Sequence, residues 1–294
     1  MTCNQLPAII VNDSTLRSVR SPLSRRDQID IATALERAGV DEIELGLPSG
    51  SGAIEDLAFV GAALCRSQPI ISGPATRAFV NAAIRTGFDA IYLSASLSVS
   101  RGGRAALLAG IRRVVSYAAE KGLAVALEGE DASRSDLDLV CDVIAAAETA
   151  GARRFRYTDT TGVLHPIRTH CQFRQLCAET DLELEFRGHD HFGLATANTL
   201  AAIQGGATHI SVSAAGPDLE TRPAQLAGVT DAIRRLGVHH THVNIPQLPV
   251  LGALVAARTP WLAAQKAPWP RQTPRIWDPS GVAKEAGGSD HAPR

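Results

Sequence analysis

The stretch from Leu182 to Ser213 constrains the fold of this chain more than any other part of it. Its first residues, LELEFR, alternate apolar and charged side chains, which is typical of a β-strand. A charged GHDH segment, an alanine-rich helical segment over about 193–205 and a short strand over His209–Ser213 follow. Strand, polar tip, helix and strand make one βαβ unit, and such a unit belongs to a parallel sheet.

The same alternation recurs along most of the chain and predicts eight strand–helix cycles. Ser24 is a suitable N-cap for the first long helix, and several helices end at a glycine such as Gly39. The strands are expected over residues 8–12, 41–46, 69–72, 89–94, 123–128, 153–158, 182–187 and 209–213. The helices are expected over about 24–38, 54–66, 75–86, 104–121, 133–150, a segment after His165-Pro166, 193–205 and 222–236.

Eight such repeats match the (β/α)8 TIM barrel in number and length, so we predict an α/β protein of that architecture. A doubly wound open sheet is the alternative, but it would show a glycine-rich phosphate turn after its first strand, where this chain reads DSTLRS. We expect the barrel over 1–240, a remnant of a post-barrel segment over 241–265, and a partly disordered, Pro- and Gly-rich tail over 266–294.

Composition argues against several classes of function. The net charge is −1 and aromatic residues make up 4%, so we expect neither a nucleic-acid partner nor binding to an acidic membrane surface. No apolar run approaches the roughly 20 residues that span a membrane, and the amino terminus does not read as a signal peptide. The five cysteines include no CxxC pair, which favours a reduced, cytoplasmic protein.

Polar side chains gather where the predicted strands end, and in a barrel those ends converge on one mouth. Taken alone, each could be a solvated loop charge, and Ser133, Asp159 or Thr160 could cap the segment that follows. At least five successive strand ends carry such residues, however, and a mouth with several arginines suits a small anionic substrate, because guanidinium groups bind carboxylates bidentately. The candidates are Asp13, Arg17, Glu44, Glu130, Asp131, Arg134, Asp159, Thr160, Arg187, His189, Asp190 and His191.

Five blocks of the chain carry a resemblance to a known family. They read STLR (14–17), VDEIELGLP (40–48), GEDASRSD (129–136), RFRYTDTTGVLHP (154–166) and GLATANTLAAIQGGATH (193–209). This set of blocks resembles homocitrate synthase of the nitrogen-fixation type. More broadly, it is similar to the isopropylmalate synthase and pyruvate-carboxyltransferase-like TIM barrels. The resemblance covers about residues 8–260.

The resemblance implies an acyltransferase that condenses acetyl-CoA with a small 2-oxo acid, while a divalent metal (Mg, Mn or Zn) polarises the ketone. It implies that Arg17 stabilises the developing oxyanion, that Glu44 supports the site, and that Arg134 and Thr160 hold the substrate carboxylates. The residues we expect in substrate binding are Arg134, Thr160, Asp159 and Glu130.

The sequence departs from the family pattern at three of the four protein ligands of the metal. The family's LRDG-type turn has its ligand Asp where this chain has Ser18. The family's seventh strand ends in HxHND, and alignment without a gap places Arg187 on the first ligand His and His189 on the second. GPDLETRP replaces the GLGERAGN block, so Pro223, which cannot coordinate a metal, falls on the ligand Asn. We therefore expect the metal site to be weakened or lost, with Arg187 as a permanent cation in its place.

A shifted register would keep a metal site. His189-x-His191 is itself an HxH pair, and residues two apart on a strand face the same way. Together with Asp13 or Asp190, these histidines would supply imidazole and carboxylate ligands. This register requires a two-residue shortening between strand and helix, and the Arg187 guanidinium would repel a dication nearby.

The family continues into a carboxyl-terminal subdomain with an HESGIH-type segment, whose nearest equivalent here, WDPSGVAKEAG (277–287), lacks the matching histidine. Two hypotheses follow. The chain is a homocitrate-synthase-like enzyme with altered, metal-independent chemistry centred on Arg17, Glu44 and Arg187. Alternatively, it is a non-catalytic paralogue that serves as an anion-binding module or as the partner subunit of an active synthase. Pairing as a homodimer or with a full-length synthase is compatible with both, and a lyase-type relative would use the same mouth.

Overall fold

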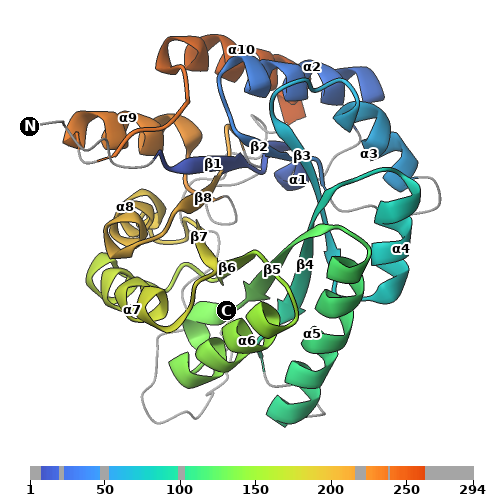
Figure 1. Ribbon diagram of the computed structural model, residues 1–294. Coiled ribbons are helices and arrows are strands. Elements are labelled where there is room, and N and C mark those ends of the chain that lie inside the picture. Colours follow the sequence, from blue (N-terminus) through green and yellow to red (C-terminus); the bar gives the residue numbers. More distant parts are fainter. Residues whose placement is uncertain are drawn as a thin grey trace, which may run out of the picture.

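The computed structural model describes residues 8–19, 23–46, 53–98, 103–215, 223–237 and 239–261. Eight parallel strands form a closed barrel, in which each strand pairs with the next in chain order and the last pairs with the first (Figure 1). The predicted TIM barrel is thus confirmed. The strands are β1 (Ile10–Asp13), β2 (Glu42–Glu44), β3 (Gln68–Pro74), β4 (Ala90–Ser96), β5 (Ala124–Glu130), β6 (Arg154–Asp159), β7 (Glu183–Gly188) and β8 (His209–Val212).

The helices lie outside the strands and form a ring around them (Figure 1). Within the described ranges, no helix is long and apolar enough to cross a membrane. The helices are α1 (Thr15–Ser18), α2 (Arg25–Arg37), α3 (Ala53–Gly61), α4 (Arg77–Arg85), α5 (Gly103–Glu120), α6 (Leu137–Thr149), α7 (Pro166–Glu179), α8 (Ala195–Gly205), α9 (Leu226–Leu236) and α10 (Leu248–Arg258), with 3-10 turns η1 (Ala132–Arg134) and η2 (Ile245–Gln247).

Helix α2 begins and ends where the sequence predicts. The Ser24 hydroxyl accepts a hydrogen bond from the Asp27 backbone N–H at 3.1 Å, as an N-cap does. After the helix, Gly39 adopts a φ of 78°, which favours glycine. A Cβ atom there would also lie 2.3 Å from the His242 carbonyl oxygen. Conformation and space both require a glycine at this position.

Two predicted helix starts are wrong. The helix expected from about residue 222 begins at Leu226, because Pro223 and Gln225 form bridges with His189 and Ser213 first. The helix expected from Ser133 begins at Leu137, because Asp131 takes a left-handed φ of 64° and the turn η1 comes first. Ser133 does not cap the helix, since its hydroxyl donates to the Asp159 carboxylate at 2.6 Å. The loop between β5 and α6 is therefore tied to the end of β6.

The barrel interior is polar, whereas the space between strands and helices is filled by apolar side chains. Arg156 lies at the centre of the interior and is fully buried. Its guanidinium contacts Glu44 at 3.0 Å and Glu185 at 2.9 Å, and it lies 3.6 Å from the centre of the Tyr92 ring. The ionic set of the interior has four arginines and four glutamates, whose formal charges balance. Five of these residues are buried: Arg156, Arg187, Glu44, Glu128 and Glu185. Arg17, Arg154 and Glu42 are partly exposed and pair with them or with each other.

The chain after α9 returns to the first long helix. The Asn244 backbone N–H donates to the Ala38 carbonyl oxygen at 2.8 Å, and α10 packs against α2. The Arg258 guanidinium donates to the Asp30 carboxylate at 2.7 Å. The predicted tail over 266–294 lies outside the described residues.

Arg156→Met should destabilise the barrel strongly. The substitution removes the cation shared by three buried carboxylates, and an uncompensated buried charge costs about 3–5 kcal/mol. We expect a loss of that size in the free energy of unfolding, measured by urea denaturation at pH 7. Arg234→Met, which removes an exposed pair with Asp231, is the matched control and should leave the transition unchanged. Equal midpoints for the two variants would contradict a dependence of the barrel on Arg156.

Candidate functional site

The mouth at the carboxyl ends of the strands is built around Arg17, which α1 places directly after β1. Its guanidinium donates to Glu44 at 2.5 Å and to Glu128 at 3.0 Å. Both carboxylates are buried, so the bonds form in a region of low dielectric, where they are strong. Arg17 is therefore held rigidly between β2 and β5.

Glu44 and Glu128 stay ionised although they are buried. Burial alone would raise the pKa of Glu44. The guanidinium groups of Arg17 and Arg156 outweigh this effect and lower the pKa to about 2. The same two arginines hold the pKa of Glu128 well below its usual range against the effect of burial. Glu128 also accepts hydrogen bonds from Ser94 at 3.0 Å and from Thr158 at 3.2 Å. Both carboxylates are permanent anions of the site.

Among the described residues, Arg187 is the least compensated of the buried cations at the mouth. Its side chain is 6% exposed, and its two polar contacts, to Glu44 and to the Ser211 hydroxyl, are both 3.4 Å long. Burial, followed by repulsion from Arg17, lowers the pKa of Arg187 to about 10. The guanidinium remains protonated at neutral pH. An anion placed beside it would relieve the unfavourable burial of its charge.

His189 follows β7 and is held as a neutral imidazole. Its Nδ1 atom lies 3.1 Å from the Asp159 carbonyl oxygen, so Nδ1 carries the proton that is donated and Nε2 keeps a lone pair. Burial, followed by repulsion from Arg187, lowers the pKa of His189 to about 4. The His189 and His191 rings meet edge to face with centroids 6.4 Å apart.

Asp159 and Thr160 organise the loops of the mouth. The Asp159 carboxylate accepts hydrogen bonds from Ser133 at 2.6 Å and from the Leu164 backbone N–H at 3.0 Å. The Thr160 hydroxyl accepts one from the backbone N–H of Asp131 at 3.0 Å. These bonds fix the β5–α6 loop against the β6–α7 loop at the rim.

The structure brings Arg17, Glu44 and Arg187 into one network, as the sequence groups them. Arg134 is separate: its side chain is 61% exposed and its partner is Asp131 at 3.7 Å. Glu130, at the end of β5, is half-buried. The predicted substrate-binding residues are thus divided: Arg134 and Thr160 lie on the loops at the rim, whereas Glu130 and the buried Asp159 end strands β5 and β6.

Sequence reasoning missed Glu128 and Arg156, although both belong to the network. Most candidates predicted from the sequence lie at or beyond the carboxyl ends of the strands, whereas these two lie within β5 and β6. Residues two apart on a strand point to one face. The spacing of Glu128 from Glu130, and of Arg156 from Thr158, therefore indicates that Glu128 and Arg156 also point into the barrel.

The donor atoms that the structure describes at the mouth do not fit a divalent metal. At the four positions that the resemblance assigns to ligands stand Ser18, Arg187, His189 and Pro223. The backbone of Pro223 forms a bridge with the backbone of His189, so a residue whose side chain cannot coordinate a metal lies next to the segment that carries the surviving imidazole. In the part of the chain that the structure describes, no three His, Cys, Asp or Glu side chains come together as a metal site requires.

The carboxylates that the shifted register would use as metal ligands, Asp13 and Asp190, are hydrogen-bonded to backbone N–H groups. The two oxygens of Asp13 accept hydrogen bonds from the backbone N–H groups of Thr15 at 2.8 Å and Ala214 at 3.1 Å. Asp190 accepts one from the Ala195 backbone N–H at 2.9 Å. Burial of Asp13 raises its pKa to about 6 in spite of these bonds. Its carboxylate serves the connection of β1 to the loop after β8.

The His189 ring should titrate with a midpoint near pH 4, which can be followed by NMR of its ring protons. Arg187→Met should raise this midpoint, because it removes a nearby positive charge, whereas Arg234→Met should not. Since the unfolded chain binds this proton near pH 6.5 and the folded chain near pH 4, the contribution of His189 to stability is lost as pH falls through this interval. An unperturbed midpoint near 6.5 would contradict the buried, neutral state.

Comparison with known proteins identifies the family of this barrel. A family model described as HMGL-like matches residues 8–255. Homocitrate synthase 1 of a Nostoc species is 30% identical, with 89% of this chain and 71% of that protein covered. The homocitrate synthase of Frankia alni is 32% identical, with 88% of this chain and 78% of that protein covered.

Among solved structures, the HMG-CoA lyase of Bacillus subtilis has the same fold. It superposes with a TM-score of 0.75 at 17% identity, covering 87% of this chain and 96% of that one. At this identity the likeness concerns architecture alone. The extent of the family match and the two homocitrate synthases lead to a plain conclusion: this chain is a member of the HMGL-like family of (β/α)8 barrels.

Proposed function

We propose that this chain binds a small 2-oxo acid at the barrel mouth and joins its keto carbon to the acetyl group of acetyl-CoA, with the Arg187 guanidinium as the fixed positive charge. Kinship with homocitrate synthases supports the reaction class. The donor set around His189 supports the absence of a metal role, because Arg187 and Pro223 stand at ligand positions.

The observation that carries the proposal is the incomplete compensation of Arg187. Arg17 has contacts of 2.5 and 3.0 Å with two carboxylates, whereas both contacts of Arg187 are 3.4 Å long. A buried guanidinium with spare donors binds carboxylate or enolate oxygens strongly, because little water competes for them. Arg187 is thus prepared for an anion that the protein itself does not provide.

The remaining residues take roles that follow from their positions. Arg17, fixed by Glu44 and Glu128, stabilises negative charge on the keto oxygen. Arg134, exposed at the rim, attracts the distal carboxylate of the substrate. Thr160 and Asp159 hold the loops on which these groups are carried, and Glu44 positions the two arginines. Sequence reasoning placed all of them in one mouth, and their assigned roles are proposals.

The reaction needs a base, and Glu130 is the carboxylate that suits this role. Burial, followed by repulsion from Glu128, raises the pKa of Glu130, and within the described residues it forms no ion pair. Glu130 would take a proton from the methyl group of acetyl-CoA, and that carbon would bond to the keto carbon. The electron pair of the keto group moves to its oxygen, which is then protonated, and water cleaves the thioester to release coenzyme A.

The alternative is an anion-binding module without turnover, alone or paired with an active synthase. The replaced ligands favour it, since Ser18 and Pro223 provide none of the carboxylate or amide oxygens that the family uses there. Both proposals share the Arg187 anion site and differ in whether a carbon–carbon bond forms.

Arg187→Met should weaken the binding of 2-oxoglutarate about 10- to 100-fold, the value of one or two charge-assisted hydrogen bonds. The measurement is isothermal titration calorimetry in buffer with EDTA, with folding of each variant checked by circular dichroism. Arg187→Lys keeps the charge but loses the planar, two-pronged guanidinium group. Its affinity for 2-oxoglutarate should therefore lie between those of the unmodified chain and Arg187→Met. Arg234→Met, remote on α9, should bind like the unmodified chain.

Release of coenzyme A from acetyl-CoA is then measured in the same buffer with pyruvate, 2-oxoisovalerate or 2-oxoglutarate. Release in EDTA supports the enzyme. Release only after addition of Mg²⁺ or Mn²⁺ contradicts the fixed-cation mechanism. Binding of a 2-oxo acid without any release supports the anion-binding module, and binding of none contradicts both proposals.

A triple variant tests the alignment behind the fixed-cation assignment. Ser18→Asp, Arg187→His and Pro223→Asn together restore the three replaced ligands around His189. Divalent-metal titration by calorimetry should show binding to this variant that the unmodified chain lacks. No gain in affinity would count against the alignment without a gap.

A further inference from the structure

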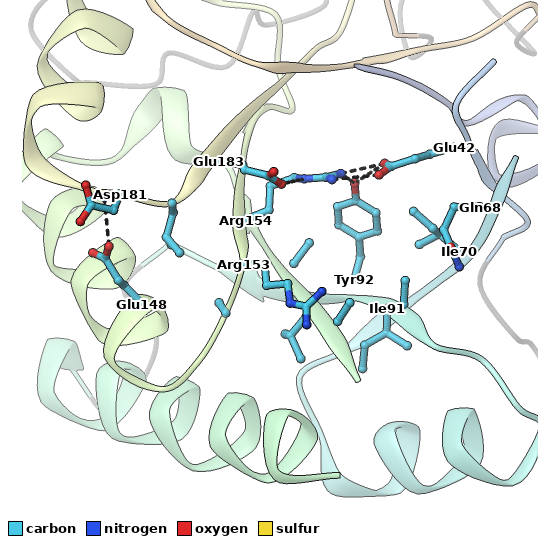
Figure 2. Close-up of a pocket in the computed structure, with 16 residues that line it drawn as sticks. Glu42, Gln68, Ile70, Ile91, Tyr92, Glu148, Arg153, Arg154, Asp181 and Glu183 are labelled. Carbon is cyan, nitrogen blue, oxygen red and sulfur yellow. Dashed lines mark hydrogen bonds and ion pairs between the residues drawn. The ribbon is translucent and has the colours of Figure 1, made fainter. Parts of the chain in front are cut away.

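A buried tyrosine at the amino end of the barrel has no role in the function proposed above. A cavity of about 680 Å³ opens at this end, lined by the first residues of strands β2 to β6 and by the segment that enters β7. Tyr92 belongs to this lining, although its side chain is only 1% exposed. Figure 2 shows its hydroxyl directed toward Arg154 and Glu42. Arg154 donates to this hydroxyl at 2.8 Å, and the hydroxyl donates to Glu185 at 2.6 Å.

Tyr92 holds Arg156 in two ways. Burial raises the pKa of Tyr92 well above its usual value, so the hydroxyl keeps its proton and donates it to one oxygen of Glu185. The other oxygen of Glu185 accepts a hydrogen bond from Nε of Arg156 at 2.9 Å. The Arg156 guanidinium also lies 3.6 Å from the centre of the Tyr92 ring, which attracts a cation through its face. The phenol therefore contacts both the cation and the carboxylate of this pair.

Arg156 and Arg187 share one oxygen atom of Glu44. Its Oε2 atom accepts from Nη1 of Arg156 at 3.0 Å and from Nη1 of Arg187 at 3.4 Å. The Oε1 atom accepts from Arg17 and from the Ser72 hydroxyl. Because two guanidinium groups compete for Oε2, a short contact with Arg156 leaves less of this negative charge to compensate Arg187.

From these contacts we propose that Tyr92 is a positioning residue for the anion site of Arg187. Its hydroxyl stabilises part of the negative charge on Glu185, so Arg156 is not drawn wholly to Glu185 and stays on the shared oxygen of Glu44. Arg187 thereby keeps donors for an incoming anion. This inference rests on the proposed function for the identity of that anion, whereas the link from Tyr92 to Arg187 concerns the chain alone.

Tyr92→Phe removes the hydroxyl and keeps the ring against Arg156. Arg154 is not left without a partner, because it donates to Glu42 at 2.7 and 2.8 Å, so the variant should fold. Tyr157→Phe is the matched control. Tyr157 is also 1% exposed, and its hydroxyl donates to Gln172 at 3.2 Å, outside the ionic network. Each variant loses one buried hydroxyl, and circular dichroism with urea denaturation checks that both are folded.

The first readout is the affinity for 2-oxoglutarate, measured by isothermal titration calorimetry in buffer with EDTA. Tyr92→Phe should weaken binding about 3- to 10-fold, the value of one net hydrogen bond, because Arg187 then pairs more closely with Glu44. Tyr157→Phe should bind like the unmodified chain. In the Arg187→Met background, Tyr92→Phe should cause no further loss, since its effect passes through Arg187. An equal loss in both backgrounds, or the same loss in Tyr157→Phe, would indicate a merely structural role and overturn the proposal.

The second readout needs no ligand. The guanidinium signals of Arg187 in ¹H–¹⁵N NMR spectra are identified by their absence in Arg187→Met. Tyr92→Phe should move them downfield, because the hydrogen bond to Glu44 becomes stronger, and Tyr157→Phe should leave them in place. Unchanged signals in Tyr92→Phe would overturn the proposal. The expected movement in a chain that binds no 2-oxo acid would support the link from Tyr92 to Arg187 and contradict the proposed function alone.

Discussion

The ion pairs of Arg156 are the interaction on which the rest of this structure depends. A TIM barrel interior is usually filled by branched apolar side chains, which pack without any need for partners. Here a fully buried guanidinium contacts Glu44 and Glu185, at 3.0 and 2.9 Å, and lies on the ring of Tyr92. Burying charges is tolerated only when each has its partner, so the interior must be complete to be stable. This requirement explains why four arginines and four glutamates occur together.

The close pairing of charges in the interior also determines the electrostatics of the mouth. Because Arg156 and Arg17 compensate Glu44 and Glu128 closely, Arg187 is left with two long contacts. Charges held by a rigid network need little reorganisation when an anion arrives, which is the condition for strong electrostatic stabilisation. A metal ion would supply positive charge at this point in the family that the sequence resembles. In the proposed function the Arg187 guanidinium supplies it instead, which agrees with a serine and a proline at two of the ligand positions.

The architecture could be predicted because strand and helix periodicity, caps such as Ser24 and helix-ending glycines such as Gly39 are local features. The convergence of Arg17, Glu44 and Arg187 followed from the barrel, since strand ends must meet. The start of α6 could not be predicted, because the left-handed backbone of Asp131 and the bond from Ser133 to the end of β6 depend on contacts across loops. The cavity at the amino ends of the strands could not be predicted from the sequence either. It is formed by the first residues of several strands, whose side chains become neighbours only in the closed barrel.

The buried network also joins the two ends of the barrel. Arg154, the first residue of β6, donates to Tyr92 at 2.8 Å, and Tyr92 donates to Glu185 at 2.6 Å. Glu185 in turn contacts Arg156, which reaches Glu44 at the mouth. The buried groups of this path are screened little by salt and polarise one another along the chain of bonds. We therefore expect a change in the contacts of Arg154 to alter the electrostatic field at Glu44. The polar interior requires a partner for each of its buried charges. The same chain of paired charges links the two ends of the barrel electrostatically.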